Sequence, residues 1–100
     1  MKYLTIMPDY TGSCLWDNFA GNIALNSLQL SDDFINRLNA WHSAYKTIIP
    51  LDEAQRKAMF LEIDRLDQEG LLLTQELKRC LAEVVKIRYY SEGRGVFLGT

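Results

Sequence analysis

A long apolar stripe in the second half of the chain constrains its fold more than any other feature. Its members recur at intervals of three or four residues, which is the spacing of one face of an α-helix. They are Met59, Ile63, Leu66, Gly70, Leu73, Leu77 and Leu81. Asp52, with Gln55 three residues later, is typical of a helix N-terminus. The pattern therefore predicts helical structure from Asp52 to about Leu81.

Gly70 lies on this stripe, where glycine costs about 1 kcal/mol relative to alanine. Two explanations are open: another part of the backbone approaches closely at Gly70, or the helix breaks there. We predict a kink or a short break.

A second apolar stripe predicts an earlier helix, from Ser31 to about Thr47. Ser31 is a good N-cap, and the two aspartates that follow it suit the first turn of a helix. The stripe consists of Phe34, Leu38, Trp41, Tyr45 and Ile48. Pro50 ends the helix. The one histidine, His42, falls one residue off this stripe, so we expect it on the surface or at its boundary.

Three segments predict strands. Residues 2–7 are rich in β-formers and apolar on both faces, which predicts an inner strand covered on each side. Residues 83–90 alternate apolar with polar side chains, which predicts a half-buried strand. A turn at residues 91–95 then leads to a short edge strand at 96–98.

The remaining residues show no helical period. Residues 9–22 predict a long loop because Gly, Asn, Asp and Ser recur in them without a pattern. Long ordered loops in compact domains are often functional. We expect residues 23–30 to be extended.

The order strand, loop, helix, helix, strand predicts the architecture. One hundred residues with 48% apolar content suit one domain, residues 1–100. We predict an α/β (α+β) fold, a small two-layer sandwich of two or three strands with two or three helices on one face. The N-terminal and C-terminal strands pair in parallel through a right-handed crossover.

Charge and hydropathy argue against several partners. The formal charge is −2, and the only adjacent basic pairs are Arg56-Lys57 and Lys78-Arg79, too few to neutralise several phosphates. We therefore expect no nucleic-acid partner. No stretch approaches the roughly 20 apolar residues of a membrane span, and the N-terminus lacks the apolar core of a signal peptide. We expect no membrane partner and a cytoplasmic protein.

The sequence contains no motif for catalysis, metal binding or a cofactor. Cys14 and Cys80 lack the spacing of a zinc site, and we expect plain thiols, with Cys80 packed as a small hydrophobe. Asp9 and Asp17 share the long loop, where we predict turn chemistry or partner contact rather than catalysis. An enzyme that uses Asp9, Asp17 and His42 is the least favoured hypothesis.

Two groups of side chains remain as candidates for partner contact. An acidic run in the second helix, relieved only by Arg65, predicts either a solvated face or a rim that meets a basic partner. Aromatic side chains in the loop either anchor it to the core or contact a partner, as Trp and Tyr often do. The predicted partner-binding residues are Asp9, Tyr10, Trp16, Asp17, Glu62, Asp64, Asp67 and Glu69.

Several short motifs follow one another across most of the chain. They are an N-terminal strand leading into Asp9-Tyr10, then Leu15-Trp16-Asp17, Leu28-Gln29-Leu30-Ser31, Trp41 with Tyr45, Glu69-Gly70-Leu71, and Val85-Lys86-Ile87-Arg88-Tyr89. This order resembles small bacterial immunity proteins, which are encoded beside polymorphic toxins of the contact-dependent growth inhibition and Rhs kind.

The resemblance implies a cytoplasmic protein that binds the C-terminal domain of a cognate toxin and blocks its active site or substrate access. Such toxins are often nucleases with basic clefts, in which acidic groups of the inhibitor stand in place of phosphates. The alternative is a non-catalytic regulatory or assembly module, whose helix from Met59 to Leu81 pairs with a copy of itself. The sequence leaves the oligomeric state open.

Overall fold

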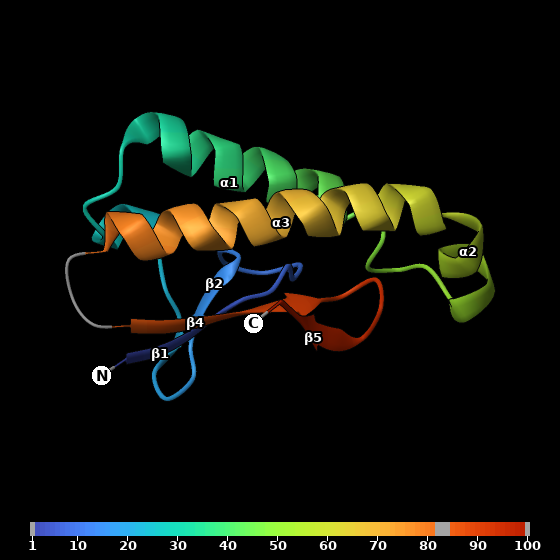
Figure 1. The fold of residues 1–100 in the computed structure, drawn as a ribbon, viewed down its shortest axis with the longest axis horizontal. Coiled ribbons are helices and arrows are strands. Elements are labelled where there is room, and N and C mark those ends of the chain that lie inside the picture. Colours follow the sequence, from blue (N-terminus) through green and yellow to red (C-terminus); the bar gives the residue numbers. More distant parts are fainter. Residues whose placement is uncertain (1, 82–84, 100) are drawn as a thin grey trace.

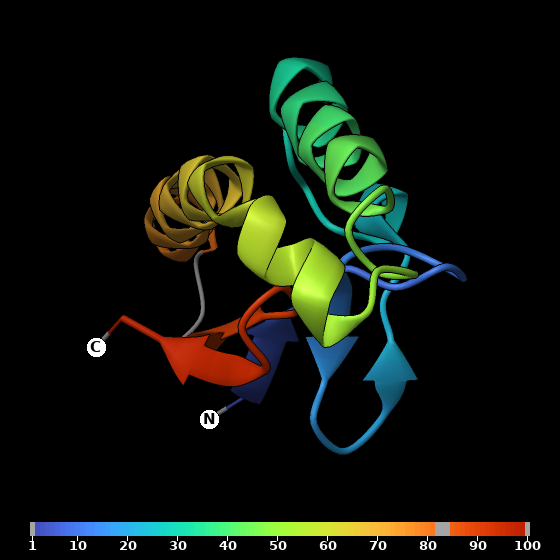
Figure 2. The ribbon, with the colours of Figure 1, turned by 90° about the vertical axis from the view of Figure 1, so that its right-hand side faces the viewer.

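The computed structural model describes residues 2–81 and 85–99. The elements in chain order are β1 (Lys2–Ile6), β2 (Leu15–Asp17), β3 (Gly21–Asn22), the 3-10 helix η1 (Leu25–Ser27), α1 (Asp32–Tyr45), α2 (Glu53–Ala58), α3 (Phe60–Cys80), β4 (Val85–Ser91) and β5 (Val96–Leu98). Figures 1 and 2 show α1 and α3 next to each other on one face of the sheet. This α+β architecture confirms the predicted fold class, although the sheet has five strands rather than two or three. None of the described helices is long and apolar enough to cross a bilayer.

The first strand lies at the centre of the sheet, whose order is β3-β2-β1-β4-β5. β1 pairs in parallel with β4, from Lys2 opposite Val85 to Ile6 opposite Tyr89, and antiparallel with β2. Two parallel neighbours need a crossover connection, and the helical layer supplies it. The predicted inner position of the first strand and its pairing with the C-terminal strand are both confirmed.

The two faces of the sheet differ in their cover. The helices lie over one face of the sheet (Figure 2). Leu4, Ile6, Ile87 and Tyr89 of β1 and β4 are buried in the core. On the opposite face Thr5 is buried, at 7% exposure, whereas Tyr3 is 41% exposed, so the predicted cover on each side of β1 is confirmed at Thr5 and wrong at Tyr3. Aromatic contacts shield this face only in part: the rings of Tyr3 and Phe19 lie 6.2 Å apart, and Arg88 stacks 4.1 Å from the ring centroid of Phe97.

Two short strands occupy part of the predicted loop at residues 9–22. The Ser13 backbone N–H donates to Asn22 Oδ1 at 3.0 Å, and Asn22 Nδ2 donates to the Ser13 carbonyl at 2.9 Å. Gly21, with φ of +94°, allows the turn into β3. The loop prediction is therefore wrong over β2 and β3. These strands have three and two residues, too few for an alternation of apolar and polar side chains to be visible in the sequence. Likewise, η1 interrupts the extended segment predicted for residues 23–30.

Both predicted helix starts are confirmed. The Ser31 hydroxyl accepts a hydrogen bond from the Phe34 backbone N–H at 3.1 Å. The Asp52 carboxylate accepts from the Gln55 N–H at 2.8 Å, and the Gln55 side chain accepts in return from the Asp52 N–H at 3.0 Å. These bonds satisfy N–H groups that have no partner within the helix.

The helical layer breaks at Met59 and not at Gly70. Helix α3 passes through Gly70 without interruption, so the predicted kink there is wrong. A Cβ on Gly70 would lie 2.6 Å from Cζ of Tyr89 and closer still to Cε1, so an aromatic ring makes the close approach. Met59 adopts φ −101° and ψ 20° between α2 and α3, and its side chain is 40% exposed rather than part of the core.

The core lies where the two apolar stripes meet over the sheet. The Trp41 indole packs there and donates to the Leu66 carbonyl at 2.9 Å. His42 is also buried, at 4% exposure, so its predicted surface position is wrong. The chain that follows β1 covers it: its Nε2 lies 2.7 Å from the carbonyl oxygen of Asp9 and 3.1 Å from the backbone nitrogen of Asp9.

The two free cysteines have opposite environments. Cys14 is buried, and burial raises the pKa of its thiol to about 12. Cys80 is exposed, so its predicted packing as a small hydrophobe is wrong. It ends α3 in a turn whose last three side chains all face solvent.

Candidate functional site

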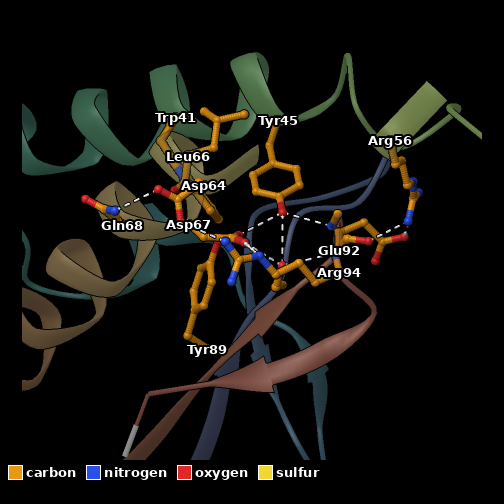
Figure 3. A network of polar contacts seen from close by, with 12 residues as sticks. Trp41, Tyr45, Arg56, Asp64, Leu66, Asp67, Gln68, Tyr89, Glu92 and Arg94 are labelled. Atoms are coloured by element: carbon orange, nitrogen blue, oxygen red, sulfur yellow. Dashed lines mark hydrogen bonds and ion pairs between the residues drawn. The ribbon is translucent and has the colours of Figure 1, made fainter. Parts of the chain in front are cut away.

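A buried carboxylate, Asp67, lies at the centre of a polar network between α1, α3 and β4 (Figure 3). Its Oδ1 accepts hydrogen bonds from the hydroxyls of Tyr45 at 2.8 Å and Tyr89 at 2.7 Å. Its Oδ2 accepts from Ser91 Oγ at 2.7 Å and lies 3.3 Å from Nε of Arg94. A buried charge is tolerated only with such complete pairing, so Asp67 serves the interior of the fold.

The same network fixes the turn that joins β4 to β5. The Tyr45 hydroxyl accepts from the Gly93 backbone N–H at 2.8 Å, and Ser91 Oγ accepts from the Arg94 N–H at 3.2 Å. Burial raises the pKa of Tyr45 to about 12, so its hydroxyl keeps the proton that it donates to Asp67. The turn is therefore held against α1 and α3 by interior bonds.

Helix α2 is attached to the other side of this turn. The guanidinium group of Arg56 donates to the carbonyl of Glu92 at 2.6 Å (Figure 3). It also donates to the carbonyl of Ile49 at 2.9 Å. A cavity of about 490 Å³ lies between α2, the start of α3 and the turn. Leu51, Phe60 and Ile63 give it apolar walls.

An exposed apolar segment begins α3 beside this cavity. Met59, Phe60 and Leu61 are 40%, 60% and 75% exposed. The acidic side chains Glu62, Asp64 and Glu69 follow on the same helix, each at least 39% exposed. We call these six residues the junction surface: Met59, Phe60, Leu61, Glu62 and Asp64 lie close to where α2 meets α3, and Glu69 lies further along α3. An apolar centre with a charged rim is the usual anatomy of a protein interface.

The acidic rim is partly neutralised by two arginines. Arg65 Nε donates to the Glu62 carboxylate at 3.2 Å, and this bond holds the pKa of Glu62 below its usual range. Nη1 of the same arginine lies 3.8 Å from the Glu69 carboxylate. Arg94 donates to Asp64 at 2.7 Å. With buried Asp67 included, four carboxylates face two guanidinium groups and a net charge of −2 remains. The rim attracts cations more weakly than the sequence alone indicates.

The structure removes Asp67 from the predicted partner-binding residues. Its side chain is 1% exposed, and both oxygens are occupied by internal donors. On a helix, Asp67 falls four residues after the buried Ile63 and three before the buried Gly70, so it faces inward with the stripe. Helical spacing in the sequence thus indicates that Asp67 is buried, although its charge suggests a position on the surface.

Asp9 and Asp17 do not converge. Asp17 lies in β2 opposite Leu4, whereas Asp9 lies beyond the other end of β1. Asp9 accepts from the N–H of the next residue at 2.7 Å. Asp17 accepts from the N–H groups of Phe19 and Ala20 at 2.8 and 3.1 Å, and these bonds lower its pKa. Both aspartates serve their own turns, which confirms that part of the prediction.

Tyr10 and Trp16, the two aromatic residues predicted to contact a partner, differ in solvent exposure. Tyr10 is 56% exposed, so its ring is free to meet a partner. Trp16 is half-buried in β2, and its Nε1 has no hydrogen-bond partner within the described residues.

The least favoured hypothesis, an enzyme built on Asp9, Asp17 and His42, has no geometric basis. His42 contacts the backbone of Asp9, and the carboxylate of Asp17 is held in a separate turn. Within residues 2–81 and 85–99, no three His, Cys, Asp or Glu side chains are grouped to hold a metal ion.

The apolar stripe of α3 is buried inside the domain. Ile63, Leu66, Leu73 and Leu77 are at most 4% exposed, since they pack into the domain's own core. The assembly alternative needs this stripe for pairing with a second helix, and that surface is not available. The exposed Phe60 and Leu61 lie off the stripe, so helical periodicity in the sequence did not single them out. The sequence did offer one sign of their exposure: Met59, Phe60 and Leu61 are consecutive apolar residues, and one helix face can bury only one of the three.

One family model matches nearly the whole chain. The family described as Serratia CdiI immunity protein-like matches residues 2–92, a range that includes the junction surface and all of the polar network except Gly93 and Arg94. No curated protein sequence matches the chain.

Proposed function

Because the chain belongs to the Serratia CdiI immunity protein-like family, we propose that it binds and neutralises the toxin domain encoded beside it. Binding blocks the active site of the toxin or the access of its substrate. The match over residues 2–92 is the observation that carries this proposal. The protein acts in the cytoplasm of the cell that it protects.

The junction surface makes the principal contact with the toxin. Phe60 and Leu61 supply exposed apolar area, and burying such area is the main driving force of association. Glu62, Asp64 and Glu69 surround this area with charge. Charged rims contribute to the rate of association and to the choice of partner.

The toxin is a nuclease with a basic cleft. The three exposed carboxylates of the junction surface occupy positions that substrate phosphates would take. Their pairing with Arg65 and Arg94 is consistent with this role, because basic groups of a toxin can replace these internal partners. Charge matching of this kind discriminates between related toxins.

Two smaller regions add to this contact: Asp9 and Tyr10 beyond the end of β1, and Trp16 and Asp17 in β2. The exposure of Tyr10 supports this assignment, since tyrosine offers a large apolar ring with a polar end. The two aspartates contribute through their charge, because their oxygens already cap turns.

Calorimetric titration of the purified toxin domain with the purified chain tests the proposed function. We expect a saturable complex, and mixing the two proteins should abolish nuclease activity. A toxin domain that binds no detectable amount of the folded chain and stays fully active would refute the proposal.

A pair of double variants tests the role of the acidic rim. Glu62→Gln with Glu69→Gln removes two rim charges, whereas Asp32→Asn with Asp33→Asn removes two charges from the start of α1. Only the rim variant should slow association and reduce its dependence on salt concentration. Equal association rates for both double variants would exclude the rim from the contact.

A further inference from the structure

A groove lies on the face of the sheet opposite to the one that α1 and α3 cover (Figures 1 and 2). Its volume is about 400 Å³. The two central strands and the β2–β3 turn line it, and we call it the sheet groove: Tyr3, Leu4, Asn18, Phe19, Lys86 and Arg88. Tyr3 pairs with Lys86 across the parallel strands, so an aromatic ring and a cation are neighbours on this face.

Phe19 gives the sheet groove an apolar side chain that the fold holds out in solvent. It is 85% exposed, and its ring lies 6.2 Å from that of Tyr3 in an edge-to-face arrangement. The turn that carries Phe19 is fixed, because the Asp17 carboxylate accepts from the N–H groups of Phe19 and Ala20. A ring held in place in advance loses little conformational entropy on binding, which favours contact with a partner.

The charged side chains that line the sheet groove are both basic. Lys86 and Arg88 are exposed, and neither forms an ion pair with a carboxylate of residues 2–81 or 85–99. The neighbouring Asp17 is already engaged: its backbone hydrogen bonds lower its pKa, and the charge of Lys2 lowers it further. Two cations without an acidic counterpart favour an anionic occupant.

The environment of Arg88 suits a carboxylate. Its guanidinium group stacks 4.1 Å from the ring centroid of Phe97. Stacking uses the flat face of the guanidinium group and leaves its N–H edges outward, and these edges pair with a carboxylate through two parallel hydrogen bonds. In the part of the chain that the structure describes, these N–H groups donate to no acceptor.

The same features make a nucleic acid a poorer match. Two cations neutralise few phosphates. A base needs a free aromatic face for stacking, whereas Arg88 covers one face of the Phe97 ring and Tyr90 packs against that ring at 5.1 Å. A peptide that combines a carboxylate with an apolar side chain uses both the cations and the exposed ring of Phe19.

We propose that the sheet groove binds an acidic segment of the toxin domain, with a carboxylate on Lys86 and Arg88 and an apolar side chain against Phe19. The inference rests on the proposed function and adds that the toxin carries an acidic segment apart from its basic cleft. Trp16, one of the proposed toxin contacts, lies opposite Thr5 on the same face, so the groove extends that contact. Two contact surfaces of opposite charge fix the orientation of the partner.

Two matched pairs of variants test the inference by calorimetric titration with the toxin domain. Arg88→Gln removes a cation of the groove, and Arg79→Gln removes an equally exposed class of arginine from the last turn of α3. Phe19→Ala truncates the exposed ring, and Leu72→Ala truncates an apolar residue of α3 that is 66% exposed. Thermal unfolding checks that each variant is folded at the titration temperature.

Only the groove variants should weaken binding. We expect a loss of about tenfold for Phe19→Ala and of about fivefold for Arg88→Gln, against less than about twofold for each control. Arg88→Gln should also reduce the dependence of association on salt concentration, because it removes a charge that attracts the acidic segment.

Two probes test the chemistry of the occupant. A random copolymer of glutamate and tyrosine should compete with the toxin domain for the wild-type chain and bind Arg88→Gln more weakly. Failure of the copolymer to compete would overturn the inference. A labelled oligothymidylate that binds the wild-type chain tightly and Arg88→Gln weakly would assign the groove to single-stranded nucleic acid and would overturn it as well.

The titrations separate this inference from the proposed function. If the wild-type chain binds the toxin domain and neither Arg88→Gln nor Phe19→Ala differs from its control, the groove is not a contact and the immunity function stands. If the wild-type chain does not bind the toxin domain, the proposed function fails and this inference fails with it.

Discussion

The ring of Tyr89 occupies the space that a side chain at Gly70 would need. A Cβ at residue 70 would lie 2.7 Å from the Tyr89 hydroxyl oxygen, and that hydroxyl donates to Asp67 one helical turn earlier. Glycine is therefore required inside α3 so that the ring can lie across the helix and reach the buried carboxylate. A local cost in helix propensity is offset by a contact between α3 and β4.

Replacing this glycine should destabilise the fold. Gly70→Ala should lower the free energy of unfolding by about 1–3 kcal/mol through overpacking, even though alanine favours an exposed helix by about 1 kcal/mol. Urea unfolding measures the effect, with the exposed Gln75→Ala of the same helix as the control. A Gly70→Ala protein as stable as wild type would mean that the ring does not pack as described.

Asp67 should be far more important for stability than its exposed neighbour on α3. Asp67→Asn replaces one carboxylate oxygen, which accepts hydrogen bonds, by an NH₂ group that faces other donors. The free energy of unfolding should fall by about 3–5 kcal/mol, as for other broken buried ion pairs. Asp64→Asn should cost about 1 kcal/mol or less, because its pair with Arg94 is exposed. Chemical denaturation of the two variants compares them directly, and equal losses would contradict a structural role for Asp67.

Stability should decrease in mild acid because of His42. Burial lowers the pKa of His42 below its ordinary value of 6.5, so the unfolded chain binds a proton more readily than the folded chain. The contribution of neutral His42 is complete above about pH 6.5 and is lost as the pH falls towards the lowered pKa. Unfolding free energies measured from about pH 7 to pH 5 should fall less steeply for His42→Gln. Parallel curves for the two proteins would rule out this source of pH dependence.

The two cysteines should react at very different rates. In the folded protein a thiol-specific maleimide should label Cys80 quickly, while Cys14 is buried and burial keeps its pKa near 12. Mass spectrometry should find one label before unfolding and two after it. The Cys80→Ser variant should take up almost no label while folded. Rapid labelling of that variant would show that Cys14 is accessible.

Much of the fold could be predicted from local patterns. The stripes of α1 and α3, the caps at Ser31 and Asp52, and the central strand all follow from spacing and side-chain chemistry. The strands β2 and β3 could not, because β2 is defined by pairing with β1, β3 is defined by pairing with β2, and each spans only a few residues.

The candidate site was less accessible to sequence reasoning. The charge of Asp67 suggested the surface, whereas donors distant in sequence, such as Tyr89 and Ser91, place it inside. Phe60 was overlooked because it lies off the apolar stripe, although Met59, Phe60 and Leu61 are three consecutive apolar residues. Local spacing therefore carried a signal for both residues, but only the contacts made in the folded chain decide which side chains are buried.

Growth of cells that produce the neighbouring toxin domain, with and without this chain, tests the central claim most directly. Cells that make both proteins should grow like cells without the toxin, and cells that make the toxin alone should stop growing. Continued arrest in cells that hold the folded chain in molar excess would contradict the claim that this protein confers immunity.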